Sequence, residues 1–320
     1  MSKNLSIVLD DHDFLSELLG ANDKNLKHLE KIIGIPIFSR GNELFLDSDD
    51  AKLQKDFQEM ISRLHDEVKN GRIINQDLLR ALYLSIHQGE SYKADLIQKN
   101  EVNVPRSFRK IQARSYNQAL YLEAIQDKEM IFGIGPAGTG KTFLAVATAL
   151  REVLSHQKKK IILTRPVVEA DESLGFLPGD LEQKIQPYLR PIYDALEKIL
   201  SLDMISKLEE SGMLEIAPLA YMRGRTLSDC FVILDEAQNT TRKQMMMFLT
   251  RIEKGTRAVI TGDITQIDLP KRRDSGLLEA MELLPDIEEI SFVYFNEEDV
   301  IRSPLVKKIV KAYRIKEDER

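Results

Sequence analysis

The spacing of hydrophobic residues in the first part of the chain predicts a small unit that mixes helices with strands. Apolar positions recur at helical spacing over residues 25–33, and again over residues 49–68 and 76–87. Between the first two segments, residues 35–46 form two short apolar runs around a turn at residues 39–42, which is typical of a β-hairpin. This order of helix, hairpin and helices predicts a small α+β fold.

Apolar periodicity is lost after residue 87, and Pro105 disfavours a helix at the residue before it. We therefore expect a domain boundary near Val104. Residues 1–104 are predicted to form an N-terminal domain with a helical connector. Residues 105–320 are predicted to form the second domain.

Beyond this boundary, short apolar runs alternate with longer helical segments. Uninterrupted apolar runs are typical of strands that are covered on both faces, and helices between them imply a mostly parallel sheet. The second domain is therefore predicted to be α/β. The expected strands are residues 130–134, 160–164, 214–219, 230–235, 257–263 and 290–295.

Composition narrows the class of protein. Of 320 residues, 43 % are hydrophobic and 30 % are charged, as in an ordinary globular protein. Neither a signal peptide nor a run of about 20 apolar residues is found, so we expect a soluble, cytoplasmic protein that does not bind membranes. The single cysteine, Cys230, excludes an internal disulfide.

The formal net charge of −6 argues against a surface that is basic overall, as nucleic-acid binders often have. A basic surface would have to be local. One candidate lies in residues 104–114, although such a run is equally typical of a solvated linker. Its cations are Arg106, Arg109, Lys110 and Arg114.

One glycine-rich stretch matches the pattern G-x-x-x-x-G-K-[ST] of a phosphate-binding loop, between an expected strand and a helical pattern. Glycines let backbone N–H groups approach phosphate oxygens, and a helix N-terminus adds a favourable dipole. We expect Lys141 to contact the β- and γ-phosphates and Thr142 to bind Mg²⁺. The nucleotide cradle would consist of Gly135, Pro136, Ala137, Gly138, Thr139 and Gly140.

Two acidic residues end the apolar strand CFVILD. Acids at the end of a buried strand are costly unless they face a cation, so we expect Asp235 to help hold Mg²⁺ and Glu236 to deprotonate the attacking water. The next strand, RAVITGD, leads to Gln266, a candidate sensor of the γ-phosphate. The alternatives are a helix cap for the acid pair and an ordinary turn for GDITQ.

In this order, the motifs GPAGTGKT, ILTRP, DEAQN and TGDITQ resemble the first motifs of superfamily 1 helicases. More closely, residues 117–313 resemble PhoH-like proteins, a bacterial family of ATPases, through TRPVVEADESLGFLPGDLEQKIQPYLRP and IAPLAYMRGRTL. The resemblance implies a RecA-like P-loop domain with ATP and Mg²⁺ as cofactors. The unit ahead of it resembles the N-terminal KH-like segment of longer members.

The resemblance also implies roles for residues outside the loop. Gln118 is similar to the helicase glutamine that reads adenine, because an amide can both donate to N7 and accept from the N6 amine; the alternative is a surface residue of a helix. The motif ILTRP implies that Thr164 and Arg165 contact nucleic acid. Residues 165–191, rich in proline, are expected to begin as a loop beside the ATP site.

Only about 55 residues follow TGDITQ, too few for a second RecA-like domain with its arginine finger. If hydrolysis is efficient, the finger must come from a neighbouring subunit, and the resemblance is consistent with a hexameric ring. Arg302 is the first candidate, ahead of Arg251 and Arg257, and surface salt bridging is the alternative for each.

The function implied is an ATPase that couples hydrolysis to binding or remodelling of single-stranded or ribosomal RNA, beside an endoribonuclease in ribosomal RNA maturation. The KH signature is degraded, because residues 20–26 read GANDKNL where G-x-x-G is expected; subunit docking is the alternative for that domain. Two other functions stay open. One is a nucleotide-gated binding module that recruits a nuclease or ribosomal component without unwinding, and the other is a small-molecule kinase.

Overall fold

The computed structural model describes residues 5–69, 74, 76–87, 89, 93, 96–97, 99–105, 107, 110–167 and 181–300. At residues 76–77, 81, 84 and 181–185 it describes the backbone alone.

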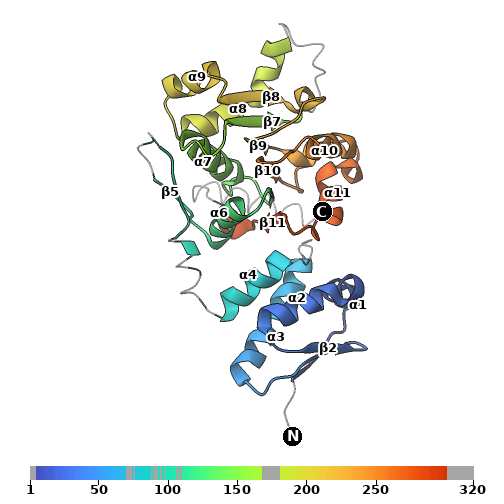
Figure 1. Cartoon of the computed structure of the whole chain (residues 1–320). Helices are drawn as coiled ribbons and strands as arrows, with labels where there is room; N and C mark the ends of the chain where they lie inside the picture. The colour runs from blue at the N-terminus through green and yellow to red at the C-terminus, as the bar shows by residue number, and fades with distance from the viewer. Residues whose placement is uncertain are drawn as a thin grey trace, which may run out of the picture.

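The N-terminal part is an antiparallel sheet covered by helices (Figure 1). The predicted hairpin and helices are present, and the sheet order is β1-β3-β2. One core joins the inner face of the sheet to the helices, with Leu29, Leu44, Phe57 and Leu64 buried at its centre. In chain order the elements are β1 (Leu5–Val8), α1 (His12–Leu19), α2 (Lys24–Ile33), β2 (Ile37–Arg40), β3 (Glu43–Leu46), α3 (Ala51–Lys69) and α4 (Gln76–His87).

A two-stranded hairpin spans the predicted domain boundary. Strand β4 (Glu101–Asn103) pairs antiparallel with β5 (Lys110–Gln112). Val102 and Val104 are buried in the same core as the helices of the following domain. The boundary near Val104 stays a prediction, and this hairpin connects the residues on its two sides.

The second part contains a six-stranded sheet in which every pairing is parallel, in the order β11-β6-β10-β9-β7-β8. The α/β RecA-like fold expected from the sequence is confirmed, as is the small antiparallel sheet before it. All six expected strands occur, each within one residue of its expected bounds. They are β6 (Met130–Ile134), β7 (Lys160–Arg165), β8 (Leu214–Pro218), β9 (Cys230–Leu234), β10 (Arg257–Gly262) and β11 (Ile290–Tyr294).

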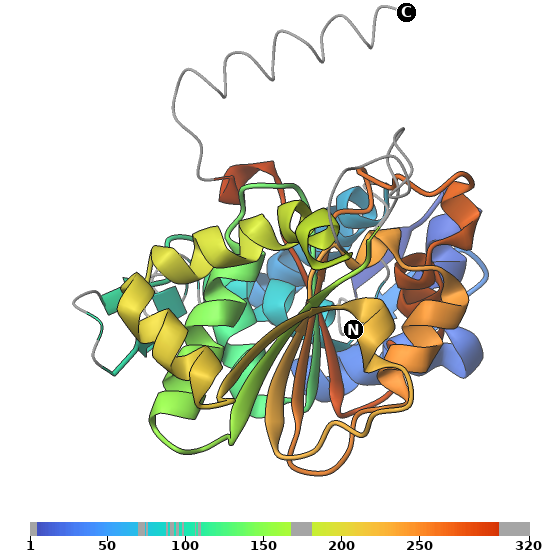
Figure 2. The ribbon, with the colours of Figure 1, turned by 90° about the horizontal axis from the view of Figure 1, so that it is seen from above.

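Helices cover both faces of this sheet, and Figure 2 shows it between the two layers. One layer packs on one apolar core and consists of α6 (Tyr116–Asp127), α7 (Lys141–Leu154), α8 (Leu181–Glu197) and α9 (Leu202–Glu210). The other layer packs on the second core and consists of α10 (Arg242–Leu249) and α11 (Gly276–Leu283). Because the strands are parallel, the loops that follow β6, β9 and β10 meet at one edge of the sheet.

The later part of the proline-rich segment after β7 is helical. Pro187 and Pro191 lie inside α8, where each removes one backbone donor from the helix. Residues 168–180, where the loop was expected, lie outside the described part of the chain.

The single cysteine, Cys230, opens strand β9 and is fully buried. Burial raises the pKa of its thiol. None of the helices in the described part of the chain has the length and apolar character needed to span a bilayer.

Candidate nucleotide-binding site

The phosphate-binding motif forms a tight loop between β6 and α7. Gly135, Gly138 and Gly140 have φ values of 148°, 85° and 87°, and residues with a side chain rarely adopt such values. A Cβ added to Gly135 would lie 2.5 Å from the carbonyl oxygen of Phe295. Helix α7 begins at Lys141, so its N-terminal dipole faces the loop. The loop is therefore shaped as an anion cradle.

Lys141 is buried against its own loop. Its Nζ donates to the carbonyl oxygens of Gly135 at 2.6 Å and Pro136 at 2.8 Å. Burial lowers the pKa of Lys141, and the carboxylates of Asp263 and Asp235 oppose that shift. The ammonium is thus held beside the loop, where a phosphate would meet it.

Asp235 is the centre of a small hydroxyl network. Its Oδ1 accepts from Thr142 Oγ1 at 2.7 Å and from Thr261 Oγ1 at 2.6 Å. Magnesium prefers oxygen ligands and keeps several waters, so a hydroxyl and a carboxylate beside a phosphate cradle suit it. Within the described ranges no cluster of three or more His, Cys, Asp or Glu could hold a metal by itself.

Glu236 has a strained backbone, with φ 52° and ψ 40°. Such strain persists only where the surroundings hold it, and it is common at functional sites. Its Oε2 accepts from Gln238 Nε2 at 2.5 Å, and its Oε1 lies 3.5 Å from Arg165 Nη2. Burial, and next the charge of Asp235, raise the pKa of Glu236.

The loop after β10 is tied to the phosphate loop through Asp263. Its Oδ2 accepts from the backbone N–H of Ala137 at 3.0 Å and from Gln266 Nε2 at 2.6 Å. Gln238 joins the same network, because its Oε1 accepts from Asp263 N at 3.0 Å and its Nε2 donates to Gln266 O at 3.1 Å. The structure therefore brings Lys141, Thr142, Asp235, Glu236 and Gln266 to one edge of the sheet.

Sequence reasoning missed three members of this network. Thr261 opens the motif TGDITQ, but its place at the end of an apolar strand gives no sign that its hydroxyl holds Asp235. Asp263 and Gln238 lie within TGDITQ and DEAQN, so their motifs pointed to the region but not to their contacts.

Gln118 is buried, with 2 % of its surface exposed. Its Oε1 accepts from the backbone N–H of Arg114 at 2.8 Å, and its Nε2 donates to the carbonyl of Thr139 at 2.9 Å. In this arrangement its amide holds the phosphate loop to the start of α6. It is not an exposed surface residue, and adenine reading by Gln118 stays a prediction.

The other expected contacts are placed differently. Arg302, Arg106 and Arg109 lie outside the described residues. Arg257 is engaged at the amino-terminal edge of the sheet by Glu152 and by two backbone carbonyls. Arg251 precedes strand β10 and therefore lies toward the same amino-terminal edge. Neither of these arginines reaches the phosphate loop of its own chain.

The two residues of ILTRP expected to contact nucleic acid turn inward. Thr164 is fully buried, and its backbone carbonyl accepts from Asp235 N at 2.9 Å. Arg165 bridges Glu236 and the carbonyl oxygen of Tyr188 in α8, at 3.3 Å from the latter. Both therefore support the site within the chain.

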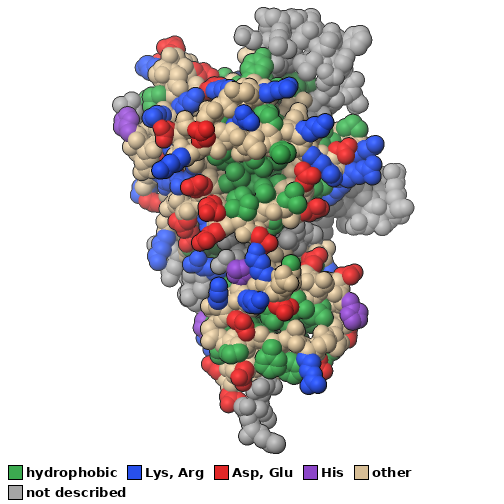
Figure 3. All heavy atoms as spheres, turned by 45° about the vertical axis from the view of Figure 1, so that its right-hand side comes forward, with side chains coloured by type: hydrophobic (Ala, Val, Ile, Leu, Met, Phe, Trp, Pro, Cys, Tyr) green, Lys and Arg blue, Asp and Glu red, His purple; other side chains and the backbone are tan. Residues whose placement is uncertain are grey.

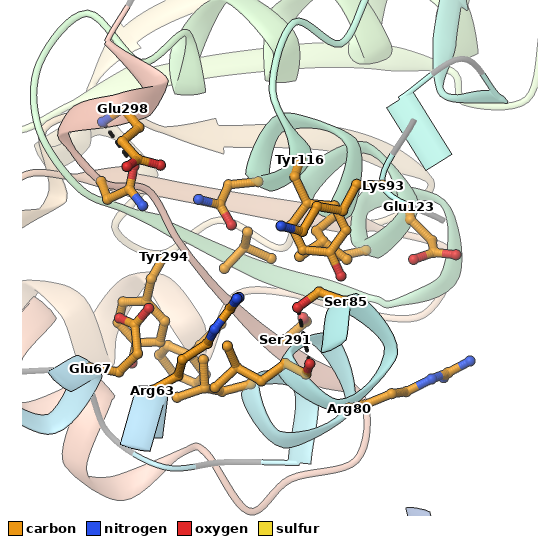
Figure 4. A pocket seen from close by; sticks show the side chains of 18 of the residues that line it. Arg63, Glu67, Arg80, Ser85, Lys93, Tyr116, Glu123, Ser291, Tyr294 and Glu298 are labelled. Carbon is orange, nitrogen blue, oxygen red and sulfur yellow. Dashed lines mark hydrogen bonds between the residues drawn. The ribbon is translucent and has the colours of Figure 1, made fainter. Parts of the chain in front are cut away.

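A separate cavity of about 410 Å³ lies between helices α3 and α4 on one side and α6 and β11 on the other (Figure 4). Its lining carries both signs of charge, including Arg63, Glu67, Arg80 and Glu123. No residue of the phosphate loop lines it, so this cavity is separate from the candidate nucleotide site.

Comparison with known proteins agrees with these motifs. Residues 110–314 match the family described as PhoH-like protein. The chain belongs to the PhoH-like family. It is 46 % identical over 305 residues to a PhoH-like protein of Bacillus subtilis (strain 168), an alignment that covers 95 % of each chain. It is 42 % identical to a PhoH-like protein of Synechocystis sp., covering 94 % of this chain and 92 % of that one.

A shorter match links the P-loop part to Protein PhoH of Escherichia coli (strain K12). The two are 47 % identical over 205 residues, which is 63 % of this chain and 58 % of that protein. The PhoH-like relatives from Bacillus subtilis and Synechocystis match the N-terminal part as well, since they align over nearly the whole chain. These names state a PhoH-like family and no reaction.

Proposed function

We propose that this PhoH-like protein is a Mg²⁺-dependent ATP hydrolase. The observation that carries the proposal is the junction of three loops at one edge of the sheet. The phosphate loop after β6, the acid pair after β9 and Asp263 after β10 are connected by the hydrogen bonds of Thr142 and Ala137. Each loop supplies a group that phosphoryl transfer to water requires.

Each side chain has a role set by its position. Lys141 would bind the β- and γ-phosphate oxygens, and Thr142 and Asp235 would hold the metal. Glu236 would orient a water and accept its proton, because its carboxylate is held beside the metal ligands and its raised pKa favours proton acceptance. ATP and Mg²⁺ supply the phosphoryl group and the cation that neutralises its charge. Gln266, bonded to Asp263, would sense the γ-phosphate.

The test is Glu236→Gln, which keeps the shape of the side chain and removes the base. We expect ATP turnover to fall at least about 100-fold, in line with the usual contribution of a general base, while ATP affinity stays within a few-fold. The matched control is Glu253→Gln, a change at an exposed glutamate before β10. Turnover that survives Glu236→Gln would remove Glu236 from the mechanism.

We further propose that hydrolysis is coupled to binding or remodelling of single-stranded or ribosomal RNA, in a homo-oligomeric ring that supplies an arginine from the neighbouring subunit. A partner endoribonuclease belongs to the same proposal. The support is the RecA-like fold, with a single six-stranded parallel sheet among the described residues, together with membership of the PhoH-like family. A finger supplied in trans makes the specific ATPase rate rise with protein concentration, so a rate that is constant on dilution would contradict the ring.

The second candidate function is a nucleotide-gated binding module that recruits a nuclease or ribosomal component without unwinding. The observation that favours this second function is the hydrogen-bond network from Gln266 through Gln238 to Glu236. Such a network would report the nucleotide state equally well in a switch. Strand separation that requires ATP hydrolysis supports the remodelling enzyme. Absence of both RNA-stimulated hydrolysis and strand separation supports the switch.

A further inference from the structure

A cluster of exposed cations lies just beyond the loop that carries Gln266. Lys271, Arg272 and Arg273 are consecutive and exposed, and they form no ion pair with any other described residue. The start of α10 lies beside them, because Arg242 Nη2 donates to the carbonyl of Arg273 at 2.7 Å. We call this group the η5 cluster, after the short turn that contains it. Its members are Lys271, Arg272, Arg273, Arg242 and Lys243.

Acidic side chains offset little of this charge. Arg242 lies 3.6 Å from Glu279, so one of the five cations is partly neutralised. Asp274 is exposed at the end of the cluster. In the view of Figure 3, lysine and arginine side chains gather at the right-hand edge of the larger part of the molecule. The cluster is therefore a local basic surface in a protein of net charge −6.

The backbone beneath the cluster is fixed to the DEAQN turn. Ser275 is fully buried, and its hydroxyl donates to the carbonyl of Gln238 at 2.8 Å. The next residue, Gly276, donates its N–H to Thr240 O at 2.8 Å. A Cβ on Gly276 would lie 2.5 Å from the Cβ of Met245, so this close approach requires glycine.

The cluster is also joined to the nucleotide site along its own loop. Asp268 N donates to Asn239 Oδ1 at 2.8 Å, and Asn239 Nδ2 donates to Asp268 Oδ2 at 2.9 Å. Gln238, which supports Ser275, also donates to Glu236. A ligand on the η5 cluster would therefore sit on a loop held at both ends by the residues around the proposed catalytic carboxylate.

We propose that the η5 cluster binds the phosphodiester backbone of a nucleic-acid strand. Adjacent lysine and arginine side chains on a rigid turn match the repeated charge of such a backbone, and the counterions released on binding provide the free energy. This inference rests on the proposed function for its link to ATP turnover. The binding surface itself is tested without ATP.

The experiment measures the affinity of the full chain for fluorescent oligouridylate and oligothymidylate by anisotropy across a range of salt concentrations. The variant is Lys271→Gln, Arg272→Gln and Arg273→Gln combined. A matched control removes the same charge from exposed lysines near the opposite edge of the sheet, by combining Lys198→Gln, Lys207→Gln and Lys254→Gln.

For the η5 variant we expect affinity at about 0.1 M salt to fall on the order of tenfold, and the slope of log K against log salt to decrease by about 2, or roughly 0.7 for each lost contact. The control should bind as the native chain does. An η5 variant with unchanged affinity and slope overturns the inference, as does a native chain that binds neither oligonucleotide. If the η5 variant loses affinity for oligouridylate alone, the ligand is RNA. If it loses affinity equally for oligouridylate and oligothymidylate, the cluster recognises the backbone without selecting the sugar.

ATP hydrolysis separates this inference from the proposed function. The η5 variant should keep its turnover in the absence of nucleic acid, because none of the three residues contacts the phosphate loop. Stimulation of turnover by the oligonucleotide should be lost with the binding. If the native chain hydrolyses no ATP, the proposed function fails while the binding measurements still decide the inference.

Discussion

The side-chain Nε2 of Gln238 donates a hydrogen bond of 2.5 Å to Oε2 of Glu236. Gln238 follows Glu236 by two residues in a turn whose backbone is strained at Glu236. The carbonyl oxygen of the same amide accepts the backbone N–H of Asp263. Gln238 is fully buried, and a Cβ on its neighbour Gly262 would lie 3.1 Å from its Oε1. One glutamine therefore orients the proposed base and connects it to the loop after β10.

Replacing Gln238 with Met keeps most of its volume and removes all three of its side-chain hydrogen bonds, to Glu236, to Gln266 O and from Asp263 N. We expect ATP turnover to fall at least about tenfold with little change in ATP affinity, because the carboxylate loses its orientation. The unpaired N–H of Asp263 should also lower the free energy of unfolding by about 1–3 kcal/mol. Steady-state kinetics and urea unfolding separate the two effects, and a folded variant with native turnover would show that Gln238 does not position Glu236.

Thr261→Val tests the hydroxyl that holds Asp235. The substitution keeps the shape of the side chain and removes the 2.6 Å hydrogen bond to Oδ1. A hydrogen bond to a charged group is worth about 1.5–3 kcal/mol, so we expect the Mg²⁺ concentration for half-maximal ATPase to rise on the order of tenfold.

The control for this change is Thr148→Val. Thr148 is also buried and donates to Leu144 O at 2.9 Å within α7, away from Asp235. It should lose stability alone, with an unchanged Mg²⁺ requirement. Equal Mg²⁺ curves for the two variants would mean that Thr261 serves only the packing of the sheet.

Gln118→Met distinguishes support of the phosphate loop from recognition of adenine. The change removes the donor to Thr139 O and the acceptor for Arg114 N. Because both ends of the amide bond to the protein, we expect affinities for ATP and GTP to fall by the same factor. Nucleotide titrations with each triphosphate measure this. A selective loss of ATP affinity would instead support adenine reading.

Arg225→Gln tests a pair at the edge strand β8. Arg225 Nη2 donates to Glu215 Oε2 at 2.8 Å, and this hydrogen bond holds the pKa of Glu215 below its ordinary value of 4.5. A lowered pKa in the folded state means that the pair stabilises the fold above pH 4.5 and loses that contribution as pH falls through the folded-state pKa.

We therefore expect this variant to unfold more easily by about 0.5–1 kcal/mol at neutral pH, since about a third of each side chain is exposed. The difference from the native chain should vanish at a pH well below 4.5. Urea unfolding at both pH values measures it. A difference that is the same at both would assign the effect to packing of the Arg225 side chain.

Periodicity was sufficient for much of this fold. The helix at residues 76–87 and the strand at residues 130–134 have the bounds that hydrophobic spacing predicts. Strand β1 and helix α1 were not predicted, because four and eight residues give too few positions to establish a period. Helix α8 continues through Pro187 and Pro191 because its packing on the sheet outweighs two missing backbone donors.

Some residues of the candidate site could likewise be predicted from the sequence, whereas others depend on the fold. Lys141, Thr142 and the acid pair were identified because their motifs are contiguous and each spacing has one physical reason. The contacts of Gln238 and Asp263 join residues that lie 25 positions apart, so no local pattern contains them. The sequence shows that three cations of the η5 cluster are consecutive, but only the fold places them beside α10 and the DEAQN turn.

The buried position of Cys230 makes this chain convenient for single-site spectroscopy. Thiol reagents attack the thiolate, and this thiol is shielded from solvent with a raised pKa. A cysteine introduced at an exposed position, such as Lys271, would therefore carry a fluorophore alone in the native background. One dye per subunit is the condition that energy-transfer measurements require when they test whether copies of this chain assemble.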